Sequence, residues 1–303
     1  LLLERLHGAF PAAVTPMTPH GDLDHVGLAE NLRWMNTLGL AGYLLLGSTG
    51  ELVHLSEFDR ALVLEVGRRS IGEGHVLIAG TGMPGTRATI EETRRAADIG
   101  ADVALVVTPN YYQKAMTATA LADHYRAVAD ASPIPIMLYS VPGITGITIP
   151  PVTVAELASH PNVIGMKNSG SDSQVAAGYR EAAGEETFLI LGGSPFAAPG
   201  LLLTGLIVGV ILAAANALPE ASVALVEAGR QGDLAQVRQH AEALHHVTET
   251  VGRFGIAGWK AGVETRGYYG GPVRSPLRNL TPQEREQIEQ EMNQLPNLDR
   301  MSC

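Results

Sequence analysis

The sequence has little cysteine, little lysine and no excess of positive charge. Its only cysteine is Cys303, the last residue, which excludes a disulfide within the chain and a cysteine-ligated metal cluster. This usage suits a reducing compartment, so we expect a cytoplasmic protein, or one of the mitochondrial matrix if the source is eukaryotic and the chain is processed. The formal net charge of -10 leaves no basic face for nucleic acid or for an anionic membrane, and neither is an expected partner.

Long hydrophobic runs and metal-ligand spacings are also missing. The opening Leu1 to Leu3 run is too short for a signal peptide, and the apolar run 201–216 is interrupted by glycines below membrane-spanning length. Among the ten histidines the one close pair is His245 and His246, which as neighbours on a predicted helix point in different directions. We therefore expect no membrane segment and no metal.

What the sequence does contain is a regular alternation of short β-rich runs and amphipathic helical stretches, typical of βαβ units. One predicted helix start is Ser56 followed by Asp59, the spacing of a capping box. Eight strands are expected: Ala9 to Thr15, Gly42 to Gly47, Val76 to Gly80, Val103 to Thr108, Ile134 to Tyr139, Val163 to Lys167, Phe188 to Gly192 and Leu206 to Leu212. Eight such units predict an α/β fold of the (β/α)8 or TIM barrel type.

The predicted barrel strands and their helices occupy residues 1–218. Residues 219–303 read as the last barrel helix followed by a C-terminal helical extension of the same domain. The alternative is an open doubly wound sheet with a dinucleotide turn at residues 80–82. It fits poorly, because the next glycine, Gly85, has the wrong spacing and Pro84 intervenes.

Candidate chemistry lies where predicted strands end, since active sites of parallel barrels form at that edge. Only three lysines occur, and Lys167 closes an apolar strand in "VIGMK". Its neighbours Val163, Ile164 and Met166 would desolvate it and favour the neutral amine, the form that attacks ketones. Taken alone, Lys167 fits a snorkelling or salt-bridged lysine better.

Two further strand ends change that balance. Tyr139 follows the fifth strand and can move protons, although a lone tyrosine is more often a core residue. The turn "GSTGE" from Gly47 to Glu51 offers backbone N–H groups to an anion, although such a turn is more often a simple connection. Glu51 itself reads as a dipole or capping group. Together these groups predict a carboxylate cradle, a hydroxyl and a buried amine in one site.

The motifs "GSTGE", "TPNYY", "YSVPGITG" and "GMKNSG" resemble, in order and spacing, those of the dihydrodipicolinate synthase and N-acetylneuraminate lyase superfamily, the pyruvate-dependent class I aldolases. The resemblance implies that Lys167 forms the Schiff base and that Tyr139 relays protons. It implies that Ser48 completes the relay and that Thr49 is its partner in binding the substrate carboxylate, at the turn that Gly47 begins.

The resemblance also assigns roles to two further residues, Tyr111 and Ile211. Tyr111 is similar to a relay tyrosine that the family contributes to a neighbouring subunit, which implies a homotetramer built as a dimer of dimers. Ile211 matches the last strand, whose main chain lines the pyruvate pocket. The substrate implied is a small 2-oxo acid.

Two positions discriminate within the superfamily. Synthases that take aspartate semialdehyde carry an arginine where this chain has Ile144, and losing it removes a bidentate carboxylate clamp. The segments "YSVPGITG", "RFGIAGWK" and "GYYGGPVRSPLRNLTPQE" are similar instead to 4-hydroxy-2-oxoglutarate aldolase, which also has serine at the place of Ser169. That aldolase differs at Asn168, where it carries aspartate, and at Ile144, where it carries asparagine.

The expected reaction is therefore cleavage of 4-hydroxy-2-oxoglutarate to pyruvate and glyoxylate through a lysine imine. No metal or organic cofactor is expected, because the lysine does what the metal does in the other aldolase class. Dihydrodipicolinate synthase is the main alternative, followed by a sugar-acid aldolase. A non-catalytic barrel that only binds 2-oxo acids is the rival from another class, since a fold does not fix a function.

Overall fold

Eight short parallel strands build the centre of the protein in a computed structural model that describes residues 2–184 and 188–295. Leu1 and Cys303 lie outside the described residues. The strands are β1 Ala9–Pro11, β2 Gly42–Leu45, β3 Val76–Gly80, β4 Val103–Val107, β5 Ile136–Ser140, β6 Val163–Asn168, β7 Leu189–Gly192 and β8 Gly209–Leu212.

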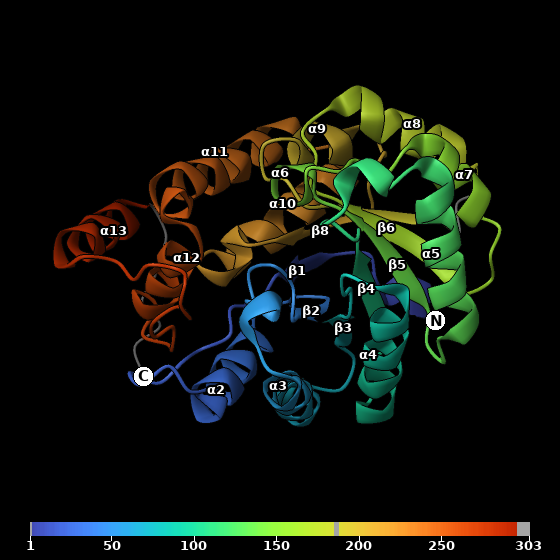
Figure 1. The fold of residues 1–303 in the computed structure, drawn as a ribbon. Helices are drawn as coiled ribbons and strands as arrows, with labels where there is room; N and C mark the ends of the chain where they lie inside the picture. Colours follow the sequence, from blue (N-terminus) through green and yellow to red (C-terminus); the bar gives the residue numbers. More distant parts are fainter. Residues whose placement is uncertain (1, 185–187, 296–303) are drawn as a thin grey trace.

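The strands follow one another in chain order around the sheet, and β1 pairs with β8. Between β1 and β2 the gap is bridged by hydrogen bonds from Ala13 N–H to Leu44 O and from Ala41 N–H to Ala9 O. The sheet is thus nearly closed, with helices outside it (Figure 1). The predicted (β/α)8 TIM barrel is confirmed.

Helices connect successive strands, as right-handed βαβ units require. They are α2 His25–Met35, α3 Glu57–Ser70, α4 Thr86–Ile99, α5 Ala118–Ala131, α7 Pro151–Leu157, α8 Ser173–Ala183 and α9 Ala198–Leu203, with the short α6 Pro142–Thr145 after β5. The short α1 Leu2–Arg5 precedes β1, and α10 Pro219–Gln231 follows β8. At α3 the predicted capping box forms, since Ser56 Oγ accepts from Asp59 N–H and the Asp59 carboxylate accepts from Ser56 N–H. None of the helices within the described ranges is long and apolar enough to cross a membrane.

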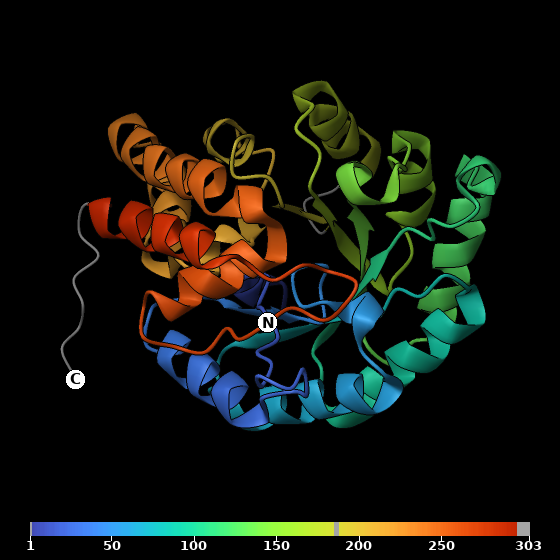
Figure 2. The same ribbon diagram turned by 60° about the vertical axis from the view of Figure 1, so that its left-hand side comes forward.

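After α10 the chain forms α11 Leu234–Thr250, α12 Gly255–Glu264 and α13 Pro282–Gln294. These three gather on one side of the barrel, and the segment between α12 and α13 runs past the blue N-terminal part of the chain (Figure 2). Single-turn 3-10 helices occur at η1 Leu52–His54, η2 Gln113–Ala115, η3 Ala214–Asn216 and η4 Gly252–Phe254. The predicted C-terminal helices are confirmed.

Two apolar layers hold the barrel together because successive residues of a strand face opposite sides. On β5, Ile136 and Leu138 face the helices, whereas Met137 and Tyr139 belong to the cluster inside the barrel. The inner cluster fills the barrel with branched and aromatic side chains, so it is a packed core rather than a pore.

The structure corrects some predicted strand ends. The first strand ends at Pro11 rather than Thr15. Ala12 and Ala13 still donate to Leu212 O and Leu44 O, but Val14 N–H donates to the Asn216 side chain instead of to a neighbouring strand. The last strand begins at Gly209 rather than Leu206, whose N–H instead bonds Leu201 O at the end of α9.

Candidate active site

Lys167 and Tyr139 lie side by side at the carboxyl ends of β6 and β5. Their Cα atoms are register partners, and the Lys167 Nζ is 4.4 Å from the centroid of the Tyr139 ring. Both side chains are buried, with 4% and 5% of their surface exposed. The strand order therefore brings the two main predicted residues together at the edge where barrel active sites form.

The surroundings of Lys167 differ from the predicted ones. Val163 and Met166 belong to the apolar layer between strands and helices, while Tyr139, the register partner of Lys167, belongs to the inner cluster. Met166 is adjacent to Lys167 and therefore takes the opposite face of the strand. Val163, four residues before Lys167, is on that opposite face as well because the pairing of β5 with β6 shifts register between Ile136 and Met137. Lys167 is desolvated by the barrel interior, and of the three predicted neighbours only Ile164 packs against that inner cluster.

The Tyr139 hydroxyl is set up to exchange protons. Burial raises its pKa, but the charge of Lys167 and hydrogen bonds with the side chains of Ser169, Lys167 and Ser48 outweigh this, so the pKa lies below the ordinary value of tyrosine. Three predicted site residues thus meet at one hydroxyl.

The turn after β2 leaves two N–H groups available. Within it, Gly50 N–H bonds Gly47 O at 3.0 Å and Glu51 N–H bonds Ser48 O at 3.2 Å. The backbone N–H groups of Ser48 and Thr49 have no acceptor among the residues that the structure describes. Such paired free N–H groups are suited to a carboxylate.

A comparison of the two buried lysines singles out Lys167. Lys260 on α12 is 0% exposed, so burial alone does not mark a catalytic lysine. Its Nζ lies 2.6 Å from Glu51 Oε1 and donates to Pro272 O. No carboxylate of residues 2–184 or 188–295 forms an ion pair with Lys167, whose amine faces a phenol instead. A buried amine with no counter-ion fits an imine-forming group.

The model of the dihydrodipicolinate synthetase family matches residues 5–295. The chain belongs to this family. An uncharacterized DapA-like lyase of Halobacterium salinarum is 35% identical over 96% of this chain and 94% of its own length. A 4-hydroxy-tetrahydrodipicolinate synthase of Xanthomonas axonopodis pv. citri is 39% identical over 75% of this chain and 74% of its own length.

Solved structures of the family superpose on the whole barrel. YagE, a prophage protein of E. coli K12 in complex with pyruvate, has a TM-score of 0.89 at 27% identity and covers 95% of this chain and 98% of its own. The dihydrodipicolinate synthase of Acinetobacter baumannii, also complexed with pyruvate, has a TM-score of 0.87 at 31% identity, with 95% and 98% covered. The chain thus belongs to the pyruvate-dependent lyases and synthases of this family.

The remaining predicted residues take different places. Ile211 lies on β8 in the inner cluster with Tyr139. Ile144, on α6, is 64% exposed and lines the cavity that opens beside Tyr139 and Ser48, about 250 Å³ in volume. Tyr111 is 80% exposed and does not line this cavity, so within one chain it stays apart from the site.

Sequence reasoning missed Gly193, which follows β7. Its N–H donates to Asn168 O at 2.7 Å, and a β-carbon there would lie 2.0 Å from Ser169 Oγ and 2.9 Å from Lys167 Cε. Only a glycine leaves room for both side chains. The signal in the sequence is the glycine pair that ends the seventh strand in "LILGGS".

The structure also accounts for part of Asn168. It is the last residue of β6, is buried, and its Oδ1 accepts from Gly170 N–H at 3.0 Å. The bond fixes the turn that carries Ser169. Its Nδ2 has no partner among the described residues.

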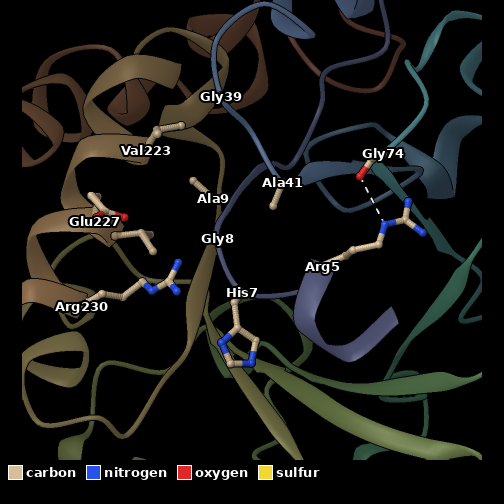
Figure 3. A pocket seen from close by; sticks show the side chains of 11 residues that line it. Arg5, His7, Gly8, Ala9, Gly39, Ala41, Gly74, Val223, Glu227 and Arg230 are labelled. Atoms are coloured by element: carbon tan, nitrogen blue, oxygen red, sulfur yellow. Dashed lines mark hydrogen bonds between the residues drawn. The ribbon is translucent and has the colours of Figure 1, made fainter. Parts of the chain in front are cut away.

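A second cavity, of about 360 Å³, lies at the opposite end of the barrel (Figure 3). Gly8 and Ala9 at the start of β1 line it, together with Arg230 from α10. Arg5, also in its wall, donates to Gly74 O and His75 O. This is the amino-terminal face, where barrel residues serve stability rather than catalysis.

Proposed function

We propose that the protein is a class I aldolase that cleaves 4-hydroxy-2-oxoglutarate to pyruvate and glyoxylate. The observation that carries the imine chemistry is the buried Lys167 amine, which has a phenol rather than a carboxylate beside it. Family membership supports the use of pyruvate, and the two pyruvate complexes are of proteins with the same fold.

In the proposed cycle the Ser48 and Thr49 N–H groups hold the C1 carboxylate, and Lys167 attacks the C2 ketone. Tyr139 donates the proton that lets water leave, which yields a cationic imine. Tyr139 then accepts the C4 hydroxyl proton as the bond between C3 and C4 breaks. Glyoxylate departs, and the electrons of that bond remain on the imine as an enamine. Protonation at C3 and addition of water release pyruvate and restore the amine.

Condensation of pyruvate with aspartate semialdehyde is the second candidate. Relatives named 4-hydroxy-tetrahydrodipicolinate synthase, 39% and 42% identical over 75% and 71% of the chain, favour it. Against it stands Ile144 at the cavity wall, where the resemblance to synthases would require arginine. An isoleucine offers nothing to a second carboxylate.

We also propose that Tyr111 acts in the site of a second copy, within a homotetramer. Its exposure, and that of Tyr112 beside it at 72%, leaves two aromatic rings on the surface of one chain. The cavity beside Tyr139 has an apolar wall that suits such a ring. Sedimentation of the purified protein, with wild type and Tyr111→Phe compared, tests this proposal.

Borohydride trapping tests the imine. The protein is incubated with pyruvate, reduced and digested, and the added mass is expected on Lys167. Lys114 and Lys260 are internal controls in the same digest. Absence of the adduct from Lys167 would overturn the proposed function. Turnover of 4-hydroxy-2-oxoglutarate, assayed beside condensation with aspartate semialdehyde, then decides between the two substrates.

A further inference from the structure

The turn that presents the Ser48 and Thr49 N–H groups is strained at both ends. Leu46 has φ 57° and Glu51 has φ 59°, and these are the two residues other than glycine with positive φ in the described parts of the chain. Left-handed backbone is unfavourable for residues with a β-carbon, and it persists only where surrounding contacts impose it. Something must therefore hold the turn.

The Glu51 side chain supplies such contacts. Its carboxylate is fully buried, with Oε1 2.6 Å from Lys260 Nζ and Oε2 accepting from Arg274 N–H at 2.8 Å. Lys260 is fixed in turn by its bond to Pro272 O at 2.7 Å. A buried carboxylate with two such partners cannot move without exposing an unpaired charge.

These contacts join the turn to the C-terminal extension. Arg274 also donates from its guanidinium to Gly21 O, His54 O and the Asp59 carboxylate, so the segment between α12 and α13 is fastened across the loops after β1 and β2 (Figure 2). The extension thus reaches a catalytic-edge loop through Glu51.

We infer that Glu51 and Lys260 are positioning residues, which hold the strained turn so that the Ser48 and Thr49 N–H groups meet the substrate carboxylate. This inference rests on the proposed function, because it needs a carboxylate substrate at that turn. Neither residue touches the reacting atoms. Their effect reaches the substrate through the backbone of residues 47–50.

The inference predicts an effect on recognition of a carboxylate and none on a ketone without one. The test is borohydride trapping on Lys167 with pyruvate and with hydroxyacetone, in wild type and in the double variant Glu51→Gln, Lys260→Met. The double variant removes both charges together, so that neither is left buried and unpaired.

We expect the concentration of pyruvate that gives half-maximal trapping to rise about tenfold, the scale of one lost charge-assisted hydrogen bond. Trapping with hydroxyacetone should change by less than about twofold, within the usual effect of a neutral substitution. Equal loss with both ketones would mean a merely structural role and would overturn the inference, as would no change with either.

The test includes two further variants, a more conservative substitution and a control. Glu51→Asp keeps the charge but shortens the side chain. We expect a smaller rise in the pyruvate concentration that gives half-maximal trapping, and no change with hydroxyacetone. This variant replaces the double variant in the test if the double variant does not fold. Glu92→Gln is the matched control, because Glu92 is a buried carboxylate paired with Arg60 and Arg95 between α3 and α4. It should lower the unfolding temperature and leave the pyruvate dependence unchanged. If wild type itself is not trapped on Lys167, the proposed function fails rather than the positioning role.

Discussion

Gly193 lies directly against Lys167, since a β-carbon on Gly193 would stand 2.9 Å from Lys167 Cε and 2.0 Å from Ser169 Oγ. Both are atoms of the candidate site, and the Ser169 side chain is one of the hydrogen-bonding partners of Tyr139. The absence of a side chain at Gly193 therefore leaves the space that the Lys167 and Ser169 side chains occupy.

Gly193→Ala is expected to slow trapping of pyruvate by about a hundredfold, because a displacement near 1 Å misaligns an attacking group. The measurement is the rate of borohydride-trapped adduct by mass spectrometry. Gly200→Ala on α9 is the control, as a β-carbon there meets nothing within 4 Å. Wild-type rates in Gly193→Ala would show that Lys167 has more room than the structure gives it.

Lys167→Met should abolish trapping and reduce turnover by about a thousandfold or more, the scale on which loss of a nucleophile acts. The same change should raise the free energy of unfolding by about 1 kcal/mol, because it removes a buried amine that has no carboxylate partner. Urea unfolding and the aldolase assay together check this prediction. Lys114→Met, on an exposed 3-10 turn, should alter neither quantity. Turnover that survives in Lys167→Met would rule out imine catalysis.

Tyr139→Phe should lower kcat by about a hundredfold, the usual contribution of a positioned proton donor. Because the pKa of Tyr139 lies below the ordinary tyrosine value, wild-type kcat should fall as the pH rises through that lowered pKa and the donor loses its proton. The variant, which has no phenol, should lack this alkaline limb. A pH profile of kcat for both proteins is the measurement, and an unchanged limb in Tyr139→Phe would assign it to another group.

The number and order of the strands could be predicted from the sequence, because each strand is a short apolar run and the spacing between runs leaves room for a helix. Strand ends could not. The stretch after Pro11 is as apolar as a strand, but the side chain of Asn216, far along the chain, accepts from Val14 N–H in place of a neighbouring strand. Hydrophobic pattern carries no information about such a distant hydrogen bond.

In the site, too, some features could be predicted from the sequence and others depend on contacts between distant residues. Lys167 and Tyr139 could be found because each ends a strand, and strand ends converge in a barrel. Glu51 was interpreted as a capping group, and it is instead one half of a buried ion pair. Its partner Lys260 lies in α12, and nothing in the local sequence of either residue marks the pairing. Of the apolar neighbours proposed for Lys167, Met166 was wrong for a local reason, since strand alternation turns it to the opposite face.

His124 on α5 should make stability depend on pH. Burial lowers its pKa to about 4, and its Nε2 has no partner among the described residues. Between pH 6.5 and 4 the unfolded chain binds a proton that the folded chain does not, so stability falls as the pH drops through this range. At pH 5 this difference in proton binding lowers the free energy of unfolding by about 2 kcal/mol.

His124→Asn, which can keep a polar contact with Thr86, should therefore flatten the fall in unfolding free energy between pH 7.5 and 5. Urea unfolding at fixed protein concentration measures it, and the exposed His20→Asn serves as control. An equal slope in wild type and His124→Asn would show that the ring is protonated in the folded state as readily as in the unfolded chain.

Ile144→Arg should move the enzyme towards aspartate semialdehyde. Ile144 is 64% exposed on the cavity wall, so an arginine there can keep its charge in water and still reach a second carboxylate. One charge-assisted hydrogen bond predicts about a tenfold rise in kcat/KM for condensation of pyruvate with aspartate semialdehyde. Val152→Arg on α7, at 62% exposure and away from the cavity, adds the same charge as a control and should have no effect. If wild type already condenses aspartate semialdehyde efficiently and Ile144→Arg adds nothing, the missing guanidinium does not discriminate between the two reactions, and the synthase assignment is then the better one.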